Sequence, residues 1–304
     1  RRSSDLRGIE GNDPVVWALA VSGARVYAGG EFEYAGGRAA RNIAVWHTGN
    51  EWIALGTGLG GYPNALALNI RGEMFVGGSF DSAGSVSASN FAVWNAVAKK
   101  WASITNGVDG QIRAVAVYGG EVFVGGNFVS AGGVTARYIA RWDGTNWNSV
   151  GGGLDGPVSA LFSDGRDLYV GGEFGAAGGV AVSNVARWDG AKWFSLGSGV
   201  GGPVHAIAAR GGRVFVGGAF TNAGGVYALN IAQYEGGRWY NLAGGVGGTV
   251  HAIVMAEDGS IFVGGESSEA GVVDGANNIA KWDGVKWRVL GSGVNGTVRS
   301  LSLF

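Results

Sequence analysis

Residues 168–204 contain the pattern that decides the fold, and they read LYVGGEFGAAGGVAVSNVARWDGAKWFSLGSGVGGPV. The stretch opens on an apolar segment, residues 168–170, which runs into the pair Gly171-Gly172, and two tryptophans follow at Trp188 and Trp193. Short segments rich in β-branched and aromatic residues, bounded by Gly, Asn, Asp and Ser, are typical of β-strands joined by tight turns. The stretch therefore predicts short strands and little helix.

The same pattern occurs six times along the chain, at intervals of 46 to 48 residues. Its Gly-Gly pairs begin at Gly29, Gly77, Gly125, Gly171, Gly217 and Gly264. Eleven of the twelve tryptophans take the same two places in the repeat. Each copy contains four strand-like segments, which in the fourth copy are residues 158–162, 167–172, 184–188 and 193–196. Four-stranded units of this length, copied six times, predict an all-β fold, a six-bladed β-propeller of four-stranded blades.

The repeats divide the whole chain, which we expect to form a single β-propeller domain, residues 1–304. The expected repeats are approximately 13–61, 62–109, 110–156, 157–202, 203–248 and 249–296, followed by a closing strand at 297–304. The first strand of the repeat thus occurs a seventh time, and residues 5–11 resemble the end of a fourth strand. An open strand edge pairs readily with other strands, so the surplus strand overlaps the ring closure, caps an edge or mediates self-assembly with another chain. The alternative is seven blades with an incomplete closing blade.

The two aromatic residues of each repeat are expected to face each other across the third and fourth strands. A two-residue Asp-Gly turn after Trp188 would place Arg187 opposite Lys192, and like charges directly opposite each other are unfavourable. A four-residue turn instead pairs the tryptophans and sends both cations to solvent. We therefore expect the tryptophans to fill the gap between blades as structural residues.

Composition excludes several classes of function. The 304 residues carry a net charge of -1 and no cysteine. A chain this neutral lacks the basic surface that nucleic acid requires, and no cysteine means no thiolate metal site and no cysteine nucleophile. No apolar run approaches 18 residues, so we expect no membrane insertion. The chain opens on Arg1-Arg2 rather than Met, so we expect a processed or trimmed product in which a signal peptide is no longer visible.

One position of the first strand varies while its neighbours do not. It lies before a recurrent small residue and is occupied by Trp17, Asn64, Arg113, Ser159, His205, His251 and Arg299. If this strand is innermost, these side chains lie near the mouth of a channel, and the candidate ligand-binding residues are Trp17, Arg113, His205 and His251. The two histidines would lie on adjacent blades, but the next copies offer serine and arginine, which are poor third ligands. We therefore expect no metal and no cofactor.

Other recurrent polar residues have simpler interpretations. The residue after each Gly-Gly pair is a carboxylate in three copies, so Glu31, Glu173 and Glu266 could ring one face of the molecule; the alternative is a solvated strand end. The asparagines before the third strand are expected to bond locally to the backbone, and they are Asn42, Asn90, Asn184, Asn230 and Asn278. Neither a nucleophile motif nor a close acidic pair singles out one blade, so no catalytic residue is expected.

The repeat consensus, VYVGGxFxxAGGxxxxNIAxWDGxxWxxLGxGVxGxV, is similar to the repeats of the fungal cortical cell-polarity marker family and of related extracellular propellers. The similarity extends over residues 13–304. A looser likeness is to kelch propellers, which share the Gly-Gly after the second strand and a Trp in the fourth. The resemblance implies an extracellular or cell-surface propeller, and it carries no catalytic residues over to this chain.

The uniform repeats favour a non-enzymatic extracellular or cell-surface propeller that acts as a protein-binding or assembly module. Enzymatic propellers usually carry long catalytic loops, whereas here the loops differ by only two or three residues. The alternative is a glycan-binding lectin, because tryptophan-rich repeats can stack on sugars. A third hypothesis is a polysaccharide-acting enzyme with a site at the channel mouth. The expected partner is thus another protein or a surface glycan.

Overall fold

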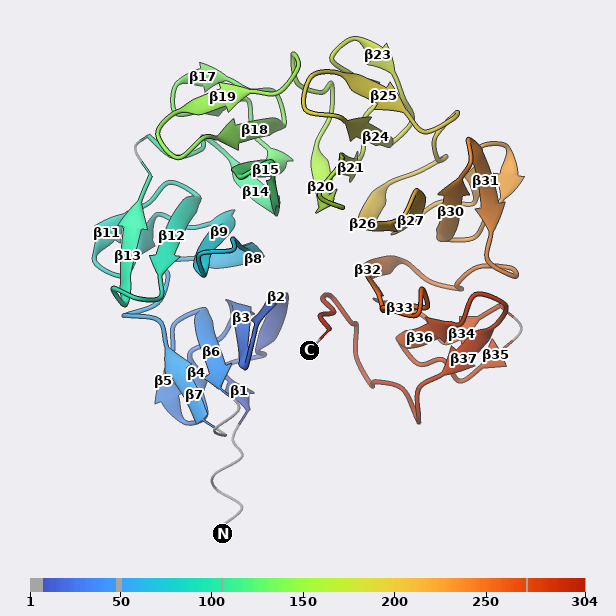
Figure 1. The fold of residues 1–304 in the computed structure, drawn as a ribbon. Coiled ribbons are helices and arrows are strands. Elements are labelled where there is room, and N and C mark those ends of the chain that lie inside the picture. Colours follow the sequence, from blue (N-terminus) through green and yellow to red (C-terminus); the bar gives the residue numbers. More distant parts are fainter. Residues whose placement is uncertain (1–7, 48–50, 105, 272, 304) are drawn as a thin grey trace. The chain divides into compact units, whose positions relative to one another are not determined.

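The computed structural model describes residues 8–47, 51–104, 106–271 and 273–303, and the regular structure in these residues is β-strand (Figure 1). These residues contain no helix that could cross a membrane. They divide into two compact units, one made of the described residues up to 136 with 140–148, the other of 137–139 with 149–303. The first three four-stranded sheets lie essentially in the first unit and the last three in the second. The interpretation of residues 1–304 as one domain stays a prediction.

Each repeat forms one four-stranded antiparallel sheet, here called a blade and numbered along the chain. The strands of the first three blades are β2 (Val15–Ser22), β3 (Arg25–Glu31), β6 (Ile43–His47) and β7 (Glu51–Ala54); β8 (Tyr62–Leu68), β9 (Glu73–Ser79), β12 (Phe91–Asn95) and β13 (Lys100–Ser103); and β14 (Gln111–Tyr118), β15 (Glu121–Asn127), β18 (Ile139–Trp142) and β19 (Trp147–Ser149). Those of the last three are β20 (Val158–Ser163), β21 (Leu168–Gly172), β24 (Val185–Trp188) and β25 (Trp193–Ser195); β26 (Val204–Arg210), β27 (Arg213–Gly218), β30 (Ile231–Glu235) and β31 (Arg238–Asn241); and β32 (Val250–Met255), β33 (Ile261–Gly265), β36 (Ile279–Trp282) and β37 (Trp287–Val289).

A small two-stranded hairpin separates the second and third strands of every blade, an element that the sequence reading did not predict. The hairpins are β4 (Tyr34–Ala35) with β5 (Arg38–Ala39), β10 (Ser82–Ala83) with β11 (Val86–Ser87), β16 (Ser130–Ala131) with β17 (Val134–Thr135), β22 (Ala176–Ala177) with β23 (Val180–Ala181), β28 (Asn222–Ala223) with β29 (Val226–Tyr227), and β34 (Glu269–Ala270) with β35 (Val273–Asp274). The first hairpin also pairs with β1 (Ile9–Glu10).

The Gly-Gly pair has two separate steric tasks. A side chain on Gly218, the second glycine of β27, would collide with the carbonyl oxygen of Pro203, the residue just before the neighbouring first strand. A side chain on Gly217 would collide with Val250 of the next blade. The second glycine therefore lets the blade pair with its own first strand, and the first lets the next blade approach.

In the first five blades, the segment that leaves the fourth strand joins the blade to the hairpin of the next. Within the first unit, Leu59 bridges Ala83 and Val108 bridges Ala131. The second unit repeats this contact three times, as Leu154–Ala177, Val200–Ala223 and Val246–Ala270. Backbone hydrogen bonds therefore link neighbouring blades within each unit, in addition to side-chain packing.

The aromatic pairs face each other as predicted and lie between blades. Trp188 is directly opposite Trp193, and the ring of Trp239 donates a hydrogen bond of 2.9 Å to the carbonyl oxygen of Leu196 in the preceding blade. The same register holds for Trp46–Trp52, Trp94–Trp101, Tyr234–Trp239 and Trp282–Trp287. The rings thus close the space between one blade and the exit segment of the previous one.

The predicted release of both cations to solvent is wrong for Arg187. Its guanidinium lies 2.9 Å from the carboxylate of Asp167 at the edge of β21, and it stacks over the ring of Phe194 at 4.2 Å. The pattern of the third and fourth strands does not include this carboxylate, because Asp167 comes from the loop before the second strand.

Candidate functional site

In each of the six complete blades, the variable side chain of the first strand occupies a β-bulge. The pairing register between first and second strands shifts around each of them, so each is the extra residue of its strand. They are Trp17, Asn64, Arg113, Ser159, His205 and His251, and all are half-buried. A bulge turns its residue out of the regular alternation of the strand. This position is therefore released from packing between sheets, which explains why its residue type changes from blade to blade.

In the second unit, the bulges of β26 and β32 bring two histidines together. The ring centroids of His205 and His251 lie 5.7 Å apart with an interplanar angle of 35°. The Nε2 atom of His251 lies 3.2 Å from Oε1 of Glu266, the residue that follows the Gly-Gly pair of β33. The sequence placed the histidines on adjacent blades, and the structure adds the glutamate to them.

In the first unit, the bulge residues make hydrogen bonds within and between blades. The side chain of Asn64 donates to the carbonyl oxygen of Ile112 in the next blade at 3.0 Å. The guanidinium of Arg113 donates to the side chain of Gln111 at 3.4 Å. Trp17 occupies the equivalent bulge of β2. Trp17 and Arg113 belong to this unit and the two histidines to the other, so the grouping of all four as one ligand site stays a prediction.

The three candidate carboxylates have different surroundings. Glu31 accepts a hydrogen bond from the hydroxyl of Tyr62, and this contact raises the pKa of that exposed tyrosine. Glu266 contacts His251, and its side chain is 51% exposed. Glu173 is exposed at the end of β21, where its backbone N–H donates to the carbonyl oxygen of Pro157. The proposal of an acidic ring made by these residues stays a prediction.

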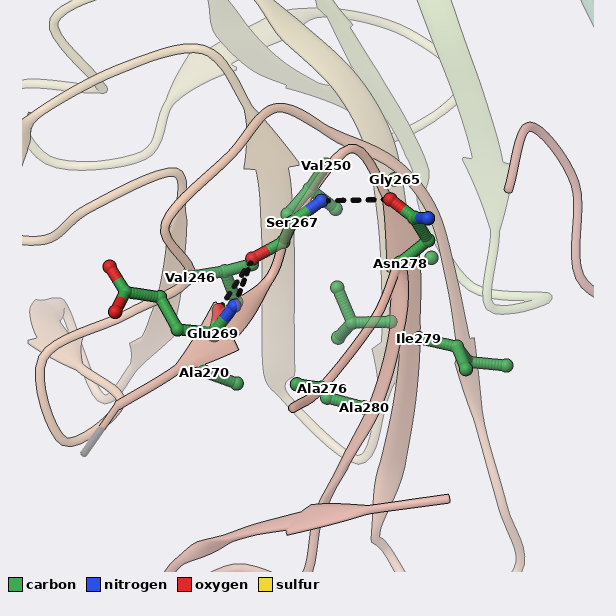
Figure 2. A pocket seen from close by; sticks show the side chains of 12 residues that line it. Val246, Val250, Gly265, Ser267, Glu269, Ala270, Ala276, Asn278, Ile279 and Ala280 are labelled. Carbon is green, nitrogen blue, oxygen red and sulfur yellow. Dashed lines mark hydrogen bonds between the residues drawn. The ribbon is translucent and has the colours of Figure 1, made fainter. Parts of the chain in front are cut away.

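A small cavity in the sixth blade marks a departure from the repeat that the sequence reading overlooked. Two residues after the Gly-Gly pair, the other five blades bury a phenylalanine at 3 to 5% exposure, namely Phe32, Phe80, Phe128, Phe174 and Phe220. The sixth blade has Ser267 there, and a cavity of about 10 Å³, the size of one water, lies among Val250, Ala270 and Ala280 (Figure 2). The hydroxyl of Ser267 donates to the carbonyl oxygen of Glu269. The signal was available in the sequence as GGES in place of GGxF.

The described residues contain no cluster of three or more His, Asp or Glu side chains that could hold a metal ion. The bulges instead present aromatic, cationic and hydrogen-bonding side chains on a rigid sheet, and side chains of these types can bind a partner. A side chain at one bulge can change without disturbing the hydrophobic packing on either side of it.

Comparisons with known proteins place the fold. Residues 159–304 match the family described as the Rax2 C-terminal beta propeller domain, while the search of curated proteins gave no match. The solved WD40 beta propeller domain of Doa1 is 13% identical over 97% of this chain and 88% of its own, with a TM-score of 0.62. The computationally designed Ika8 protein is 16% identical over 98% of this chain and 93% of its own, with a TM-score of 0.57.

A third solved structure extends the similarity to an extracellular domain. The extracellular domain of the one component system BT4673 from B. thetaiotaomicron is 10% identical over 97% of this chain and 36% of that chain, with a TM-score of 0.61. Identities this low show a shared fold and carry no function across. Together with the repeated four-stranded sheets, the similarities confirm the predicted fold class: the chain is an all-β β-propeller with six complete four-stranded blades in its described part.

Proposed function

We propose that the chain is a non-enzymatic protein-binding or assembly module that works outside the cell or at its surface. The observation that carries the proposal is the contrast between a constant framework and a changeable bulge residue. Gly-Gly pairs, aromatic pairs and hairpins recur from blade to blade, whereas the six bulges present five different residue types. A scaffold of this kind supports recognition, since it holds side chains in place without requiring a particular residue type.

The bulge residues are of the types that dominate binding energy at protein interfaces. Tryptophan and arginine are enriched among interface residues whose truncation costs most, and Trp17 and Arg113 are half-buried residues of these types in one unit. In the other unit, His205 and His251 lie in ring contact. Side chains held partly buried lose little conformational freedom on binding, which favours affinity.

The comparisons support the proposal at the level of the repeat. Residues 159–304 resemble the Rax2 C-terminal beta propeller domain, and one structural neighbour is described as an extracellular domain. The proposal also relates the chain to the fungal cortical cell-polarity marker family and, more loosely, to kelch propellers. This relationship rests on the repeat consensus. The extracellular or cell-surface location is part of the same proposal.

The burial of the fourth-strand tryptophans argues against the lectin alternative. Tryptophans stack on sugars only where a ring face reaches solvent, and the fourth-strand rings of the later blades are 3 to 7% exposed. They are Trp101, Trp147, Trp193, Trp239 and Trp287. Their faces pack between blades, so they act as core residues here.

The test compares two defined arrays, one of purified extracellular proteins and one of glycans. We expect the wild-type chain to bind members of the protein array and no glycan. The double variants Trp17→Ala/Arg113→Ala and His205→Ala/His251→Ala should each weaken protein binding at least about tenfold, or about 1.4 kcal/mol.

Matched controls come from exposed turns of the same units. Val97→Ser and Val285→Ser change side chains that are 91% and 80% exposed, and both should bind as the wild type does. Circular dichroism and thermal unfolding establish that every variant is folded. Binding to glycans alone, or equal binding by all variants, would refute the proposal.

A further inference from the structure

The cavity beside Ser267 corresponds to a place that a phenylalanine ring fills in the other blades. Phe220, its counterpart in the fifth blade, is 4% exposed and belongs to one core cluster with Val204 and Ala223. Ser267 is half-buried, and a cavity of about 10 Å³ remains beside it. The sixth blade therefore contains the site of a ring without the ring.

The apolar walls of this cavity have the same residue types, in the same order, as the surroundings of Phe220. Valines and alanines form most of the wall, namely Val246, Val250, Val263, Ala270, Ala276 and Ala280. Their counterparts in the core cluster of Phe220 are Val200, Val204, Val216, Ala223, Ala228 and Ala232. No larger side chain in this wall takes up the space of the absent ring, so the wall keeps the composition of a ring site.

The cavity lies wholly within the second unit. Its walls come from the sheet and the hairpin of the sixth blade and from the exit segment of the fifth. The valines and alanines of the wall belong to one core cluster and are at most 4% exposed. The site is therefore formed by contacts inside one unit.

The polar side chains at the cavity are already engaged. The hydroxyl of Ser267 donates to the carbonyl oxygen of Glu269 and accepts from its backbone N–H at 3.2 Å. Asn278 accepts from the backbone of Ser267 at 3.2 Å and donates to the carbonyl oxygen of Val294 at 2.8 Å. The carboxylate of Glu269 points away from the cavity (Figure 2). Because a buried water makes about three hydrogen bonds, this cavity favours an apolar occupant.

The connection from the hairpin to the third strand is longer in the sixth blade than in the others. Asn278 follows Gly265 by 13 positions, whereas Asn230 follows Gly218 by 12. The additional residue is Gly275, which has a φ of 81°. A glycine adopts many backbone conformations at little steric cost, so this connection can shift without breaking the pairing of the sheet.

We propose that this cavity is a binding site for a small apolar aromatic molecule of the size of toluene, which is the phenylalanine side chain as a free molecule. Five blades hold a phenylalanine ring in the equivalent place at 3 to 5% exposure. Apolar cavities in protein interiors bind small aromatic molecules of this kind. The proposal is independent of the proposed function.

Binding requires the cavity to expand, because a volume of about 10 Å³ holds one water and a ring is larger. The longer connection at Gly275 permits this expansion. A ring against the valines and alanines of the wall restores the dispersion contacts that an empty space forfeits. The site is therefore cryptic: the ligand makes a minor, open form of the sixth blade the dominant one.

The test follows the binding of toluene and of benzoate to the intact chain by NMR. We expect toluene to bind saturably and to give intermolecular NOEs to the methyl groups of Val246, Val250 and Val263. Benzoate should bind at least about tenfold more weakly, because its charge would be buried without a partner. The absence of saturable toluene binding, NOEs only to other blades, or equal binding of benzoate overturns the proposal.

Two chain variants complete the experiment. Ser267→Phe supplies the ring from the chain itself and should weaken toluene binding at least about tenfold. Ser268→Phe adds the same ring at the exposed neighbouring position and should bind toluene as the wild type does. Circular dichroism establishes that both are folded, and Ala280→Val, which narrows the cavity, replaces an unfolded S267F variant with the same expected loss. Toluene binding that survives the filling of the cavity, or that Ser268→Phe abolishes, overturns the proposal.

Discussion

At the scale of single residues, Ser267 shows what one substitution does to a repeated packing arrangement. Phe220 occupies the equivalent place one blade earlier at 4% exposure, held between its sheet and its hairpin. The smaller side chain of Ser267 leaves a cavity in the sixth blade. Its hydroxyl donates a hydrogen bond to the carbonyl oxygen of Glu269 (Figure 2). A cavity of this origin lowers stability because the surrounding atoms lose contacts without a compensating collapse.

Ser267→Phe should therefore raise the stability of the chain. Burial of the ring contributes roughly 2 kcal/mol, and loss of the hydroxyl's hydrogen bond removes about 1 kcal/mol, so a net gain of about 1 kcal/mol is expected. Urea unfolding followed by tryptophan fluorescence measures it. The neighbouring Ser268→Phe, at an exposed position, should give no gain; a destabilised S267F variant would show that the sixth blade has repacked around the serine.

The asparagines before the third strands were expected to bond locally to the backbone, and the structure shows that they bond to it over longer distances. Asn230 has a φ of 60°. Its Oδ1 accepts from the backbone of Phe220 at 3.1 Å, and its Nδ2 donates to the carbonyl oxygen of Val246 at 2.9 Å. One side chain thus ties the end of the second strand to the exit segment of the fourth.

Asn230→Ala should destabilise the chain by about 2–3 kcal/mol, because two hydrogen bonds are lost and alanine tolerates a positive φ poorly. Asn230→Gly removes the same bonds but adopts this φ without strain, so it should cost about 1 kcal/mol less. Chemical denaturation of the three proteins gives both differences. Equal stability of the wild type and Asn230→Ala would contradict the proposed tie.

At the scale of elements, the turn between the third and fourth strands is organised by one carboxylate. Asp283 accepts hydrogen bonds from the backbone of Lys286 and Val285 at 2.9 and 3.0 Å, and from the side chain of Arg288 at 2.8 Å. These bonds favour the ionised form and lower the pKa of Asp283 to about 2. A four-residue turn held in this way sets Trp282 directly opposite Trp287.

The turn predicts a defined dependence of stability on pH. Because the folded pKa of Asp283 lies below its unfolded value of 3.8, its contribution is present above pH 4 and is lost as the pH falls towards 2. The melting temperature of Asp283→Asn should therefore lie below that of the wild type at pH 7, and the difference should shrink between pH 4 and pH 2. A difference that stays constant across this range would rule out the ionised carboxylate as its source.

At the scale of the molecule, stability comes from contacts between successive blades within each unit. One core cluster joins Tyr169, Leu196 and Val200 of the fourth blade to Val216 and Trp239 of the fifth. Similar clusters join the first blade to the second, the second to the third, and the fifth to the sixth. Each blade is too thin to bury both faces alone, so its neighbour supplies the second half of each core. In the second, fifth and sixth blades, the fourth-strand tryptophan strengthens the junction with a hydrogen bond to the preceding blade.

Trp239→Phe should weaken the junction between the fourth and fifth blades. Phenylalanine keeps an aromatic ring but cannot donate to Leu196, and the buried carbonyl left without this donor costs about 1–2 kcal/mol. Tyr234→Phe, in the partner ring, keeps the ring contact of 5.1 Å and should change stability by less than about 0.5 kcal/mol. Hydrogen exchange of residues 204–209 reports the loosening, and equal exchange in both variants would contradict it.

The strands and the aromatic pairs could be predicted because both follow from short-range patterns that repeat. Six copies of the strand pattern average out local ambiguity, so the sequence alone assigns Trp188 and Trp193 to opposite places on the third and fourth strands. The hairpin after each second strand was missed because its paired segments are only two residues long, too short for a periodic signal.

The sequence shows that the position of the candidate site varies from repeat to repeat. It does not show the β-bulge that permits this variation. Whether His251 is a bulge depends on which residues of β33 lie opposite it, and its contact with Glu266 depends on the resulting turn of the side chain. Pairing register is a property of two strands together, so no single segment encodes it visibly.

The amino-acid order alone specified an all-β repeat protein and its strand order, because hydrophobic periodicity and turn residues act over a few positions. Tertiary packing decided where space stays unfilled: the cavity beside Ser267 appears only when the sheet and the hairpin of the sixth blade are set against each other. Burial is a relation between segments distant in the chain, and its presence or absence is settled by what covers a residue rather than by the residue itself.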